Sequence, residues 1–549
     1  MDREQMQKYN PNVPIWESWS DDVVSKVHGD LEYYRELYYG NHGELFQRAI
    51  DLIKDGEITD NITNGYRKNT KGNVRTPYIV ANVSKLIPEI PALFVSRAIG
   101  KLSIDQDVQF KTGEAEEWLS EIVEEIAKDS KLTTAHYSNI LQQQIDGGIV
   151  GVPVKDENGI RIDFKKRELY FPHEDGLGCD LAYKRRLMNK DGEMQDYLHI
   201  HRERVEERNL TTEETLYSLS DNALQPVEEE EAKWLLGVDS LTEVYVGRSR
   251  PLVCYWANEA TFDYPLGLSS LLNQGNKQDE INWTLTRLGI VYERNGKPRL
   301  AISKEVMSAL QQRAFERYGD EERIDHRDLE LVTIDENGRH MEVVQIDITK
   351  IGSISWVKDL MKLMFMETKT SEKAVDFYLE GGNSGAQSGV AKFYDLFISI
   401  IKAEKIANEY VEFLQELFEN CLWLLAQDEG YEDTIIQRPS ITINDMLPTT
   451  RKERIETEVM AKGGGIRSTE RAVRNVNPTD SDASVLAEIE RIEEDAASVN
   501  SNSGMSVGLN TLSAMLDHRD KPLVQTNEEP TQEGAEAGEE GETNEEGTN

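Results

Sequence analysis

The strongest pattern of apolar and polar positions in the chain lies between residues 390 and 427. Apolar side chains recur there at steps of three and four, from Phe393 and Phe397 to Leu425, which is the spacing of one face of a helix. No glycine or proline interrupts this stretch. At about 1.5 Å per residue, the pattern predicts a helix roughly 55 Å long, which needs a large surface to lie against.

Polar side chains interrupt the centre of this predicted helix, so it should be buried along one stripe and should not span a membrane. The segment before it, residues 381–389, reads GGNSGAQSG and predicts a flexible joint that feeds a stiff helix. We therefore expect no contact with a membrane. The interrupting side chains are Lys402, Glu404, Lys405, Asn408 and Glu409.

Upstream, the first part of the chain predicts helices. A tyrosine-rich helix from Leu31 should stop at Gly40, a residue typical of helix C-caps. Residues 76–100 are apolar but contain Pro88 and Pro91, so they predict two short buried helices with a bent joint. Residues 113–148 again have helical periodicity and end on paired glycines.

From residue 149 to residue 256 the apolar period changes to two. Short alternating runs separated by DENG, NKDG and similar turn clusters predict an antiparallel sheet built of hairpins. His199 and His201 should point to one face of a strand, where two metal ligands could meet. Because no third ligand has the usual spacing, a half-exposed strand face is the favoured interpretation over a metal site.

Two helical stretches flank a small insertion. Residues 265–293 and 352–378 have apolar faces, and an amphipathic helix is predicted over residues 303–319. Two alternating runs meet at Asn337-Gly338, a strong hairpin signal. A hairpin with one helix is too small to be stable alone, so we expect it to pair with a neighbouring copy through strand addition.

The C-terminal part begins with a strand-like segment, IIQRPSITI, followed by a helix, a glycine break and another helix. VLAEIERIEEDAA then closes the folded region. From residue 526 to residue 549 there are nine glutamates and no lysine or arginine. This composition predicts a disordered, self-repelling tail.

Charge and cysteine content narrow the class of protein. The 549-residue chain carries a formal net charge of -40, which argues against gripping nucleic acid through a broad basic surface. Such repulsion is useful where DNA must slide past without sticking. Three widely spaced cysteines without a CxxC motif predict a reduced intracellular chain, and the N-terminus does not resemble a secretory signal.

No enzyme motif is evident. GGNSGAQSG lacks the Gly-Lys-Ser/Thr ending of a phosphate-binding loop, and Ser384 is not in a nucleophile elbow. HExxH, GxGxxG and zinc-ribbon motifs do not occur. We therefore predict no catalytic residues, no metal and no cofactor. A nuclease site built from scattered carboxylates remains open.

Several segments, taken in order, resemble the portal proteins of tailed bacteriophages. The likeness spans about residues 31–495. It depends on the order in which the segments occur and on the predicted elements between them, which are a helix, an insertion, a second helix, a loop and a long helix. The segments are LEYYRELYYGNH, ANVSKLIPEIPALFVS, PLGLSSL, NSGAQSGVAKF, INDMLPTTRKERIE and GGGIRSTERAVR.

This resemblance implies an α+β, mainly helical, portal-type subunit with wing, stem, clip and crown. The antiparallel β module would lie in the wing, which the long helix would span. The implied divisions are an N-terminal wing (1–264, with the β module at 149–256), a first stem helix (265–296), a clip (297–350), a second stem helix (351–376), a tunnel loop (377–389), the long wing helix (390–430), a crown (431–495) and a disordered acidic tail (496–549).

The resemblance also implies roles for single residues. The tunnel loop would face DNA through Tyr378, Glu380, Gly381, Asn383, Ser384 and Gln387. Lysines of the second stem helix could line the channel at Lys358, Lys362, Lys369 and Lys373, although a solvated helix face explains each one equally well. Contacts within the clip would involve Leu329, Leu331, Asn337, Gly338 and Val343.

As a portal, the chain would form a homo-oligomeric ring, expected to be a dodecamer, at one capsid vertex of the virion after assembly in the host cytoplasm. Double-stranded DNA would pass through it during packaging and ejection. Its other partners would be the terminase large subunit, a head-completion adaptor, and the major capsid and scaffolding proteins. Two alternatives stay open: a virion scaffold outside the DNA path, and a metal-dependent DNA-processing enzyme.

Overall fold

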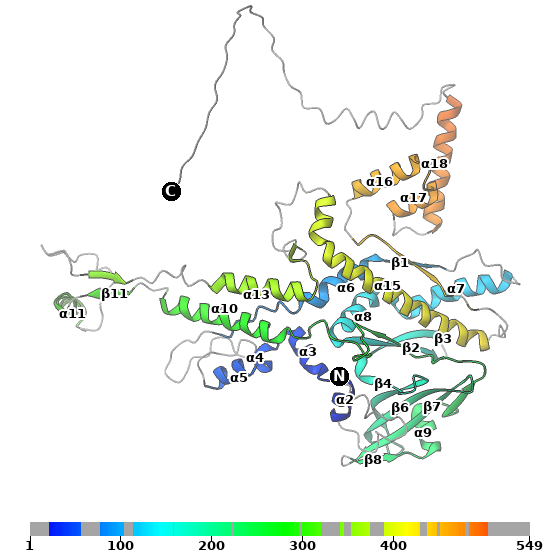
Figure 1. Cartoon of the computed structure of the whole chain (residues 1–549), viewed down its shortest axis with the longest axis horizontal. Coiled ribbons are helices and arrows are strands. Elements are labelled where there is room, and N and C mark those ends of the chain that lie inside the picture. The colour runs from blue at the N-terminus through cyan, green and yellow to red at the C-terminus, as the bar shows by residue number, and fades with distance from the viewer. Residues whose placement is uncertain are drawn as a thin grey trace, which may run out of the picture. The chain divides into compact units, whose positions relative to one another are not determined.

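The computed structural model of the chain describes residues 21–55, 77–103, 113–156, 159–220, 223–295, 299–302, 304–319, 341–344, 353–373, 389–428, 436, 438–446, 451–477 and 482–502. The chain divides into two compact units, Met1–Leu447 and Pro448–Asn549. Helices and antiparallel sheets occur together in it, which confirms the mixed fold class predicted from the sequence (Figure 1).

Four short helices begin the described chain: α2 (Asp21–His28), α3 (Leu31–Tyr39), α4 (His42–Leu45) and α5 (Gln47–Lys54). The Asp30 side chain caps α3 by accepting from the Tyr33 backbone N–H. Gly40 ends α3 with φ of 88° and donates its N–H to the Glu36 carbonyl. The predicted glycine C-cap is confirmed.

Residues 86–98 form one helix, α6 (Leu86–Ala98), where two were predicted. Pro88 lies in its first turn, where a backbone N–H has no partner within the helix in any case. Pro91 removes one interior hydrogen bond, but its ring is buried with Ile87 and Ile90, so packing stabilises the helix there. The prediction of two helices is therefore wrong.

The next helical stretch is divided into α7 (Gly113–Asp129) and α8 (Leu132–Asp146). Lys131 separates them with φ of 49°, a conformation that cannot continue a helix. Gly147 ends α8 with φ of 80°, which confirms the predicted end at the paired glycines.

Two antiparallel sheets follow, as predicted for residues 149–256. The smaller has the order β10-β2-β3, with β2 (Gly148–Asp156), β3 (Gly159–Lys166) and β10 (Cys254–Ala257). The larger has the order β4-β5-β6-β7-β8, and β9 also pairs with β7. Its strands are β4 (Tyr170–Pro172), β5 (Gly178–Met188), β6 (Met194–Glu206), β7 (Asn209–Ser220), β8 (Ala223–Pro226) and β9 (Thr242–Tyr245). The helix α9 (Glu229–Leu236), between β8 and β9, was not predicted.

The long predicted helix is present as α15 (Gly389–Asp428), with 40 residues and a length of roughly 60 Å (yellow in Figure 1). It packs against α6, α7, β2, β3 and β10, and its C-terminal two thirds supply the centre of the largest hydrophobic core. Tyr410 is fully buried there, stacked on Trp256, and its hydroxyl contacts His136 and Asn139. Phe397, predicted on the buried face, is 43% exposed.

A short strand pair connects distant parts of the chain. β1 (Ile99–Ser103) pairs antiparallel with β13 (Ser440–Ile443), which forms within the predicted strand-like segment. No described helix is both long and apolar enough to cross a membrane.

The insertion contains β11 (Arg299–Ile302), α11 (Lys304–Tyr318) and β12 (Met341–Val344). The amphipathic helix is confirmed by α11. β12 pairs antiparallel with β11, a pairing that the sequence did not predict. The turn at Asn337-Gly338 and the run before it lie outside the described residues, so the hairpin stays a prediction.

The second unit, described by itself, contains α16 (Arg451–Gly463), α17 (Thr469–Val476) and α18 (Asp482–Asn502). The predicted order of helix, glycine break and helix is confirmed by α16, Gly463–Gly465 and α17. Helix α18 runs to Asn502, past the predicted start of the tail at residue 496. The rest of the tail lies outside the described residues.

Candidate functional site at the junction of α10, α13 and α15

The two helices that flank the insertion are α10 (Gly275–Asn295) and α13 (Ser353–Glu367), and they lie side by side (Figure 1). Both are shorter than predicted, because α10 begins only at Gly275 and α13 ends at Glu367. Residues before α10 form turns, including Gly267 with φ of 80°. The predicted neighbouring arrangement is confirmed, and one hydrophobic cluster joins them: Ile281, Leu285 and Ile290 of α10 with Val357, Leu360 and Met364 of α13.

A row of polar side chains fixes α10 to the extended segment before α6. Gln278, Asn282 and Thr286 are spaced by four residues, so they share one face of the helix. In this order, they accept hydrogen bonds from the backbone N–H groups of Ser84, Ala81 and Ile79, at 3.0, 3.1 and 2.9 Å. Gln278 Nε2 also donates to the Ala81 carbonyl at 2.7 Å. The side chains thereby pair with backbone groups of a segment that belongs to no helix or strand.

Asn282 extends this row to the N-terminal helices. Its Nδ2 donates to His42 Nδ1 at 2.8 Å, and His42 Nε2 donates to the Leu37 carbonyl at 2.9 Å. This arrangement requires a neutral imidazole with its proton on Nε2. Burial lowers the pKa of His42, in agreement with that protonation state.

The C-terminus of α13 closes in a Schellman motif. The Thr370 N–H donates to the Phe365 carbonyl at 2.8 Å, and the Lys369 N–H donates to the Met366 carbonyl at 3.3 Å. Lys369 occupies the left-handed position with φ of 54°, where glycine is usual. The chain therefore turns sharply at Lys369.

Two side chains of α15 hold this turn. Ser399 Oγ accepts the Ser371 N–H at 2.6 Å, and Lys402 Nζ donates to the Thr368 carbonyl at 2.9 Å. Ser399 and Lys402 are three residues apart and share a face of α15. Burial lowers the pKa of Lys402 to about 8. The end of α13 is thus attached to α15 just before the predicted tunnel loop.

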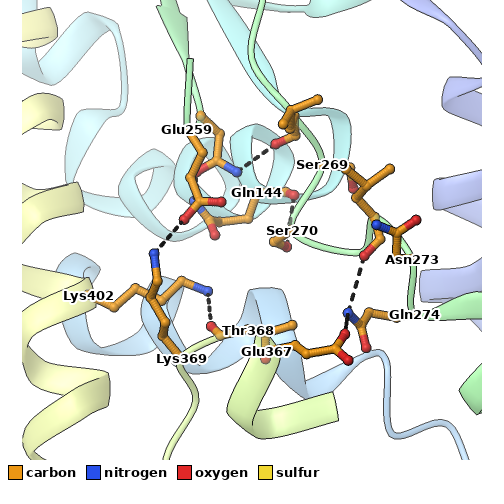
Figure 2. A pocket seen from close by; sticks show the side chains of 13 residues that line it. Gln144, Glu259, Ser269, Ser270, Asn273, Gln274, Glu367, Thr368, Lys369 and Lys402 are labelled. Atoms are coloured by element: carbon orange, nitrogen blue, oxygen red, sulfur yellow. Dashed lines mark hydrogen bonds and ion pairs between the residues drawn. The ribbon is translucent and has the colours of Figure 1, made fainter. Parts of the chain in front are cut away.

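A polar pocket of about 190 Å³ lies beside these contacts. Figure 2 shows Lys369 reaching Glu259 and Gln274 reaching Glu367, at 3.3 and 3.2 Å. Among the described residues, none is a hydrogen-bond partner of the buried Oε1 atoms of Gln144 and Gln274. Unpaired acceptors in a polar pocket suit ordered water. The wall consists of Gln144, Asn258, Glu259, Leu268, Ser269, Ser270, Leu272, Asn273, Gln274, Glu367, Thr368, Lys369 and Lys402.

The predicted channel lysines divide between two locations. Lys358 and Lys362 are exposed on α13, and Lys362 lies 3.9 Å from Glu372. Lys369 and Lys373 lie beyond the end of α13, because that helix stops at Glu367. The six predicted tunnel-loop residues, from Tyr378 to Gln387, lie outside the described residues. Leu329, Leu331, Asn337 and Gly338 also lie outside them, whereas Val343 is in β12 opposite Leu300.

The predicted histidine pair lies on one face of β6. Glu214 accepts from His199 Nε2 at 2.5 Å and from His201 Nδ1 at 2.6 Å, and His201 Nε2 lies 3.3 Å from Glu203. Burial alone would lower the pKa of His201, but its two carboxylate partners raise it to about 10. Glu203 also accepts the N–H groups of Leu252 and Val253, which lead into β10. The cluster joins the two sheets.

Among the described residues, no group of three or more His, Cys, Asp or Glu is arranged to hold a metal ion. The three cysteines, Cys179, Cys254 and Cys421, are buried and free.

Sequence reasoning missed the Gln278-Asn282-Thr286 row and the attachment through Ser399 and Lys402. A signal for the row was present, since buried amide and hydroxyl groups at a spacing of four are unusual on an otherwise apolar helix face. Nothing comparable indicated Ser399, because the backbone N–H that it accepts is not visible in a sequence pattern.

Residues 330–502 match a family model described as phage portal protein, SPP1 Gp6-like. The match confirms, over those residues, the resemblance to portal proteins predicted from the sequence. It includes β12, α13, α15, β13 and the three helices of the second unit. A comparison with curated proteins gives no match.

Among solved structures, the chain is similar to one described as the neck of a native GTA particle computed with C12 symmetry. The identity is 11% and the TM-score 0.32, over 72% of this chain and 88% of that chain.

Proposed function

We propose that this protein is the subunit of a portal ring at one capsid vertex of a phage virion. The observation that carries the proposal is the match to a portal-family model over residues 330–502. These residues include α13, the turn at Lys369 and α15. In this proposal α10 and α13 are the stem that frames the channel, and residues 297–350 are the clip. Residues 377–389 are the tunnel loop that touches DNA.

The charge distribution supports such a ring. The chain as a whole has a net charge of -40, so copies repel one another unless local surfaces are neutral. Helix α13 carries two lysines against one aspartate and one glutamate, which makes it neutral. Neutral helices can lie next to their copies without the electrostatic repulsion that acts between the acidic parts of the chain.

Exposed apolar side chains on α13 support the same arrangement. Ile354, Trp356, Leu363 and Met366 are 54%, 48%, 39% and 70% exposed. Burying such side chains stabilises an assembly by about 1.5–3 kcal/mol for each one that is fully covered. A neighbouring copy of the helix pair would cover them in a ring.

The acidic composition also suits the passage of DNA. A duplex in a predominantly negative channel is repelled from the wall and stays mobile, while exposed lysines such as Lys358 and Lys362 could make brief phosphate contacts. The terminase large subunit would dock on the ring during packaging. A head-completion adaptor would follow it, and capsid and scaffolding proteins would surround the ring from its assembly in the host cytoplasm onward.

Electron microscopy of the purified protein tests the proposal. We expect rings with an axial channel wide enough for duplex DNA, and Met366→Asp should reduce their number. Met188→Asp is the matched control, because Met188 is also exposed, at 57%, but lies on β5. Monomers or compact dimers at high protein concentration would refute the portal assignment.

Deletion of residues 381–389 tests the place of the loop in the DNA path. We expect assembled heads that contain little DNA. Heads with a normal DNA content would instead favour a scaffold outside the DNA path.

A further inference from the structure

In the described part of the second unit, very few apolar side chains are buried. Among its described residues, Ala472 and Val485 are the buried apolar ones. Five larger apolar side chains are between 40% and 81% exposed: Ile455, Val459, Met460, Ile466 and Leu486. A unit of this size needs a compact apolar core or outside support to be stable. The imbalance indicates that something else covers these side chains.

Helix α16 turns a polar face toward α17. Glu458 is buried, and its carboxylate binds Arg467 and, at 3.0 Å, Asn475 of α17. Exposed apolar side chains of α16 lie beside this contact, since Ile455 is three residues before Glu458 and Val459 directly follows it. Ile455 and Val459 are one helical turn apart, so they form one outward stripe.

Basic residues border this stripe on α16. Lys452 lies three residues before Ile455, and Lys462 lies three residues after Val459, so both project from the same side of the helix. The α16 face, as we name it, is therefore Lys452, Ile455, Val459 and Lys462. Both lysines are exposed.

Helix α18 carries a face of the opposite charge. Leu486 is 58% exposed, and Glu490 and Glu493 follow it at four and seven residues, on the same side of the helix. Both glutamates are exposed. The α18 face is therefore Leu486, Glu490 and Glu493.

The difference in charge extends beyond these two faces. Residues 451–476 contain seven Lys and Arg against four Asp and Glu, whereas residues 482–495 contain six Asp and Glu against one Arg. In a chain with a net charge of -40, a net positive segment beside an acidic helix is the local exception. Complementary potentials of this kind fix which surfaces meet and in which register.

We propose that the α18 face of one copy packs on the α16 face of the next copy, so that the second unit completes its core only on assembly. The proposal rests on the ring assembly put forward above and names the surfaces involved. Because the two faces differ, the contact is head-to-tail, and repeating it around an axis closes a ring. Within one chain α17 contacts both α16 and α18, so it sets the spacing between the two faces.

A charge-swap experiment on the full chain tests this contact. One variant carries Lys452→Glu and Lys462→Glu, and a second carries Glu490→Lys and Glu493→Lys. Each variant alone should place like charges opposite one another. We expect the concentration needed for half assembly to rise roughly tenfold at low salt in each, measured by sedimentation velocity. An equimolar mixture should assemble like the wild type, because each altered face then meets its complement.

Glu488→Lys is the matched control. It makes one Glu→Lys change on α18, but Glu488 lies two residues from Leu486, on the other side of the helix, and should leave assembly unchanged. Limited trypsin digestion gives a second measurement, because residues 451–474 contain seven Lys and Arg. These sites should be cut more slowly in wild-type rings than in the unassembled variants.

The outcomes separate the two proposals. Rings that form normally from each single variant would overturn the α16–α18 contact and leave the portal assignment intact. Assembly that is weakened in each variant but not restored in the mixture would also overturn it, since cover from within the same chain gives that result. Wild-type protein that forms no rings would instead overturn the proposed function.

Discussion

The contacts of the Gln278-Asn282-Thr286 row allow the effect of replacing Asn282 to be predicted. Asn282→Leu keeps the number and branching of the side-chain heavy atoms but removes both polar atoms from a fully buried position. The Ala81 N–H loses its acceptor and His42 Nδ1 loses its donor, whereas Gln278 keeps the Ala81 carbonyl. Each buried group left unpaired costs about 1–3 kcal/mol, so we expect a loss of about 2–6 kcal/mol.

Hydrogen exchange followed by mass spectrometry on the full chain measures this loss locally. A cost of about 3 kcal/mol corresponds to exchange that is roughly 100-fold faster, since every 1.4 kcal/mol is tenfold. The effect should be concentrated in residues 79–84 and in α3. Gln312→Leu, at an exposed position of α11, is the control and should leave exchange in those segments unchanged.

Asn282→Asp separates the hydrogen bonds from the packing. A carboxylate can still accept the Ala81 N–H, but it can pair with His42 Nδ1 only when His42 is protonated. The folded-state pKa of His42 should then lie above its ordinary value of 6.5. The variant is therefore most stable relative to the unfolded chain below pH 6.5 and loses that advantage as the pH rises through the new pKa. Unchanged exchange in Asn282→Leu, or an Asn282→Asp variant without this pH dependence, would refute the reasoning.

Three further predictions concern other positions. Gly267→Ala should destabilise the first unit by about 3 kcal/mol or more in chemical denaturation, because a Cβ at this position would lie 2.3 Å from the Gly147 carbonyl oxygen and φ is 80°. The control is Gly237→Ala, where φ is 70° and the space around a Cβ is open, and it should cost about 1 kcal/mol. His201→Gln should remove a stability term that is full below pH 6.5 and fades as the pH rises toward 10, so the denaturation midpoints of wild type and variant should converge in alkali. Lys402→Met should speed hydrogen exchange at residues 368–371. Because folding lowers the pKa of Lys402 from 10.5 to about 8, the stability of the wild type relative to Lys402→Met should rise between pH 8 and pH 10.5.

Long periodic elements were predictable because their patterns repeat many times. Helix α15 repeats its apolar spacing over 40 residues, so single deviations such as Phe397 do not obscure it. The hairpins of the β module alternate with clear turn clusters and were predicted as a sheet. Their division into two sheets was not, because strand pairing between β10 and β2 joins residues far apart in sequence.

Local rules failed where tertiary contacts decided the outcome. Pro88 and Pro91 predict a broken helix, but burial of α6 in the core outweighs the lost hydrogen bond. Helix α10 starts late because Gly267 must approach the backbone of Gly147 and Asn258, which requires a turn that the apolar periodicity of the segment conceals. The junction also depends on Ser399, which accepts a hydrogen bond from the Ser371 N–H, and no periodicity in the sequence indicates that contact.

The position of α15 within the chain has a consequence for biosynthesis. The hairpins of β5, β6 and β7 join neighbours in sequence, so they can form as soon as the ribosome releases them. By contrast, α6, α8 and β2 present apolar surface to α15, which is translated much later. Nascent chains therefore expose an incomplete, aggregation-prone hydrophobic core until residue 428 has left the ribosome. During that interval they depend most on chaperones.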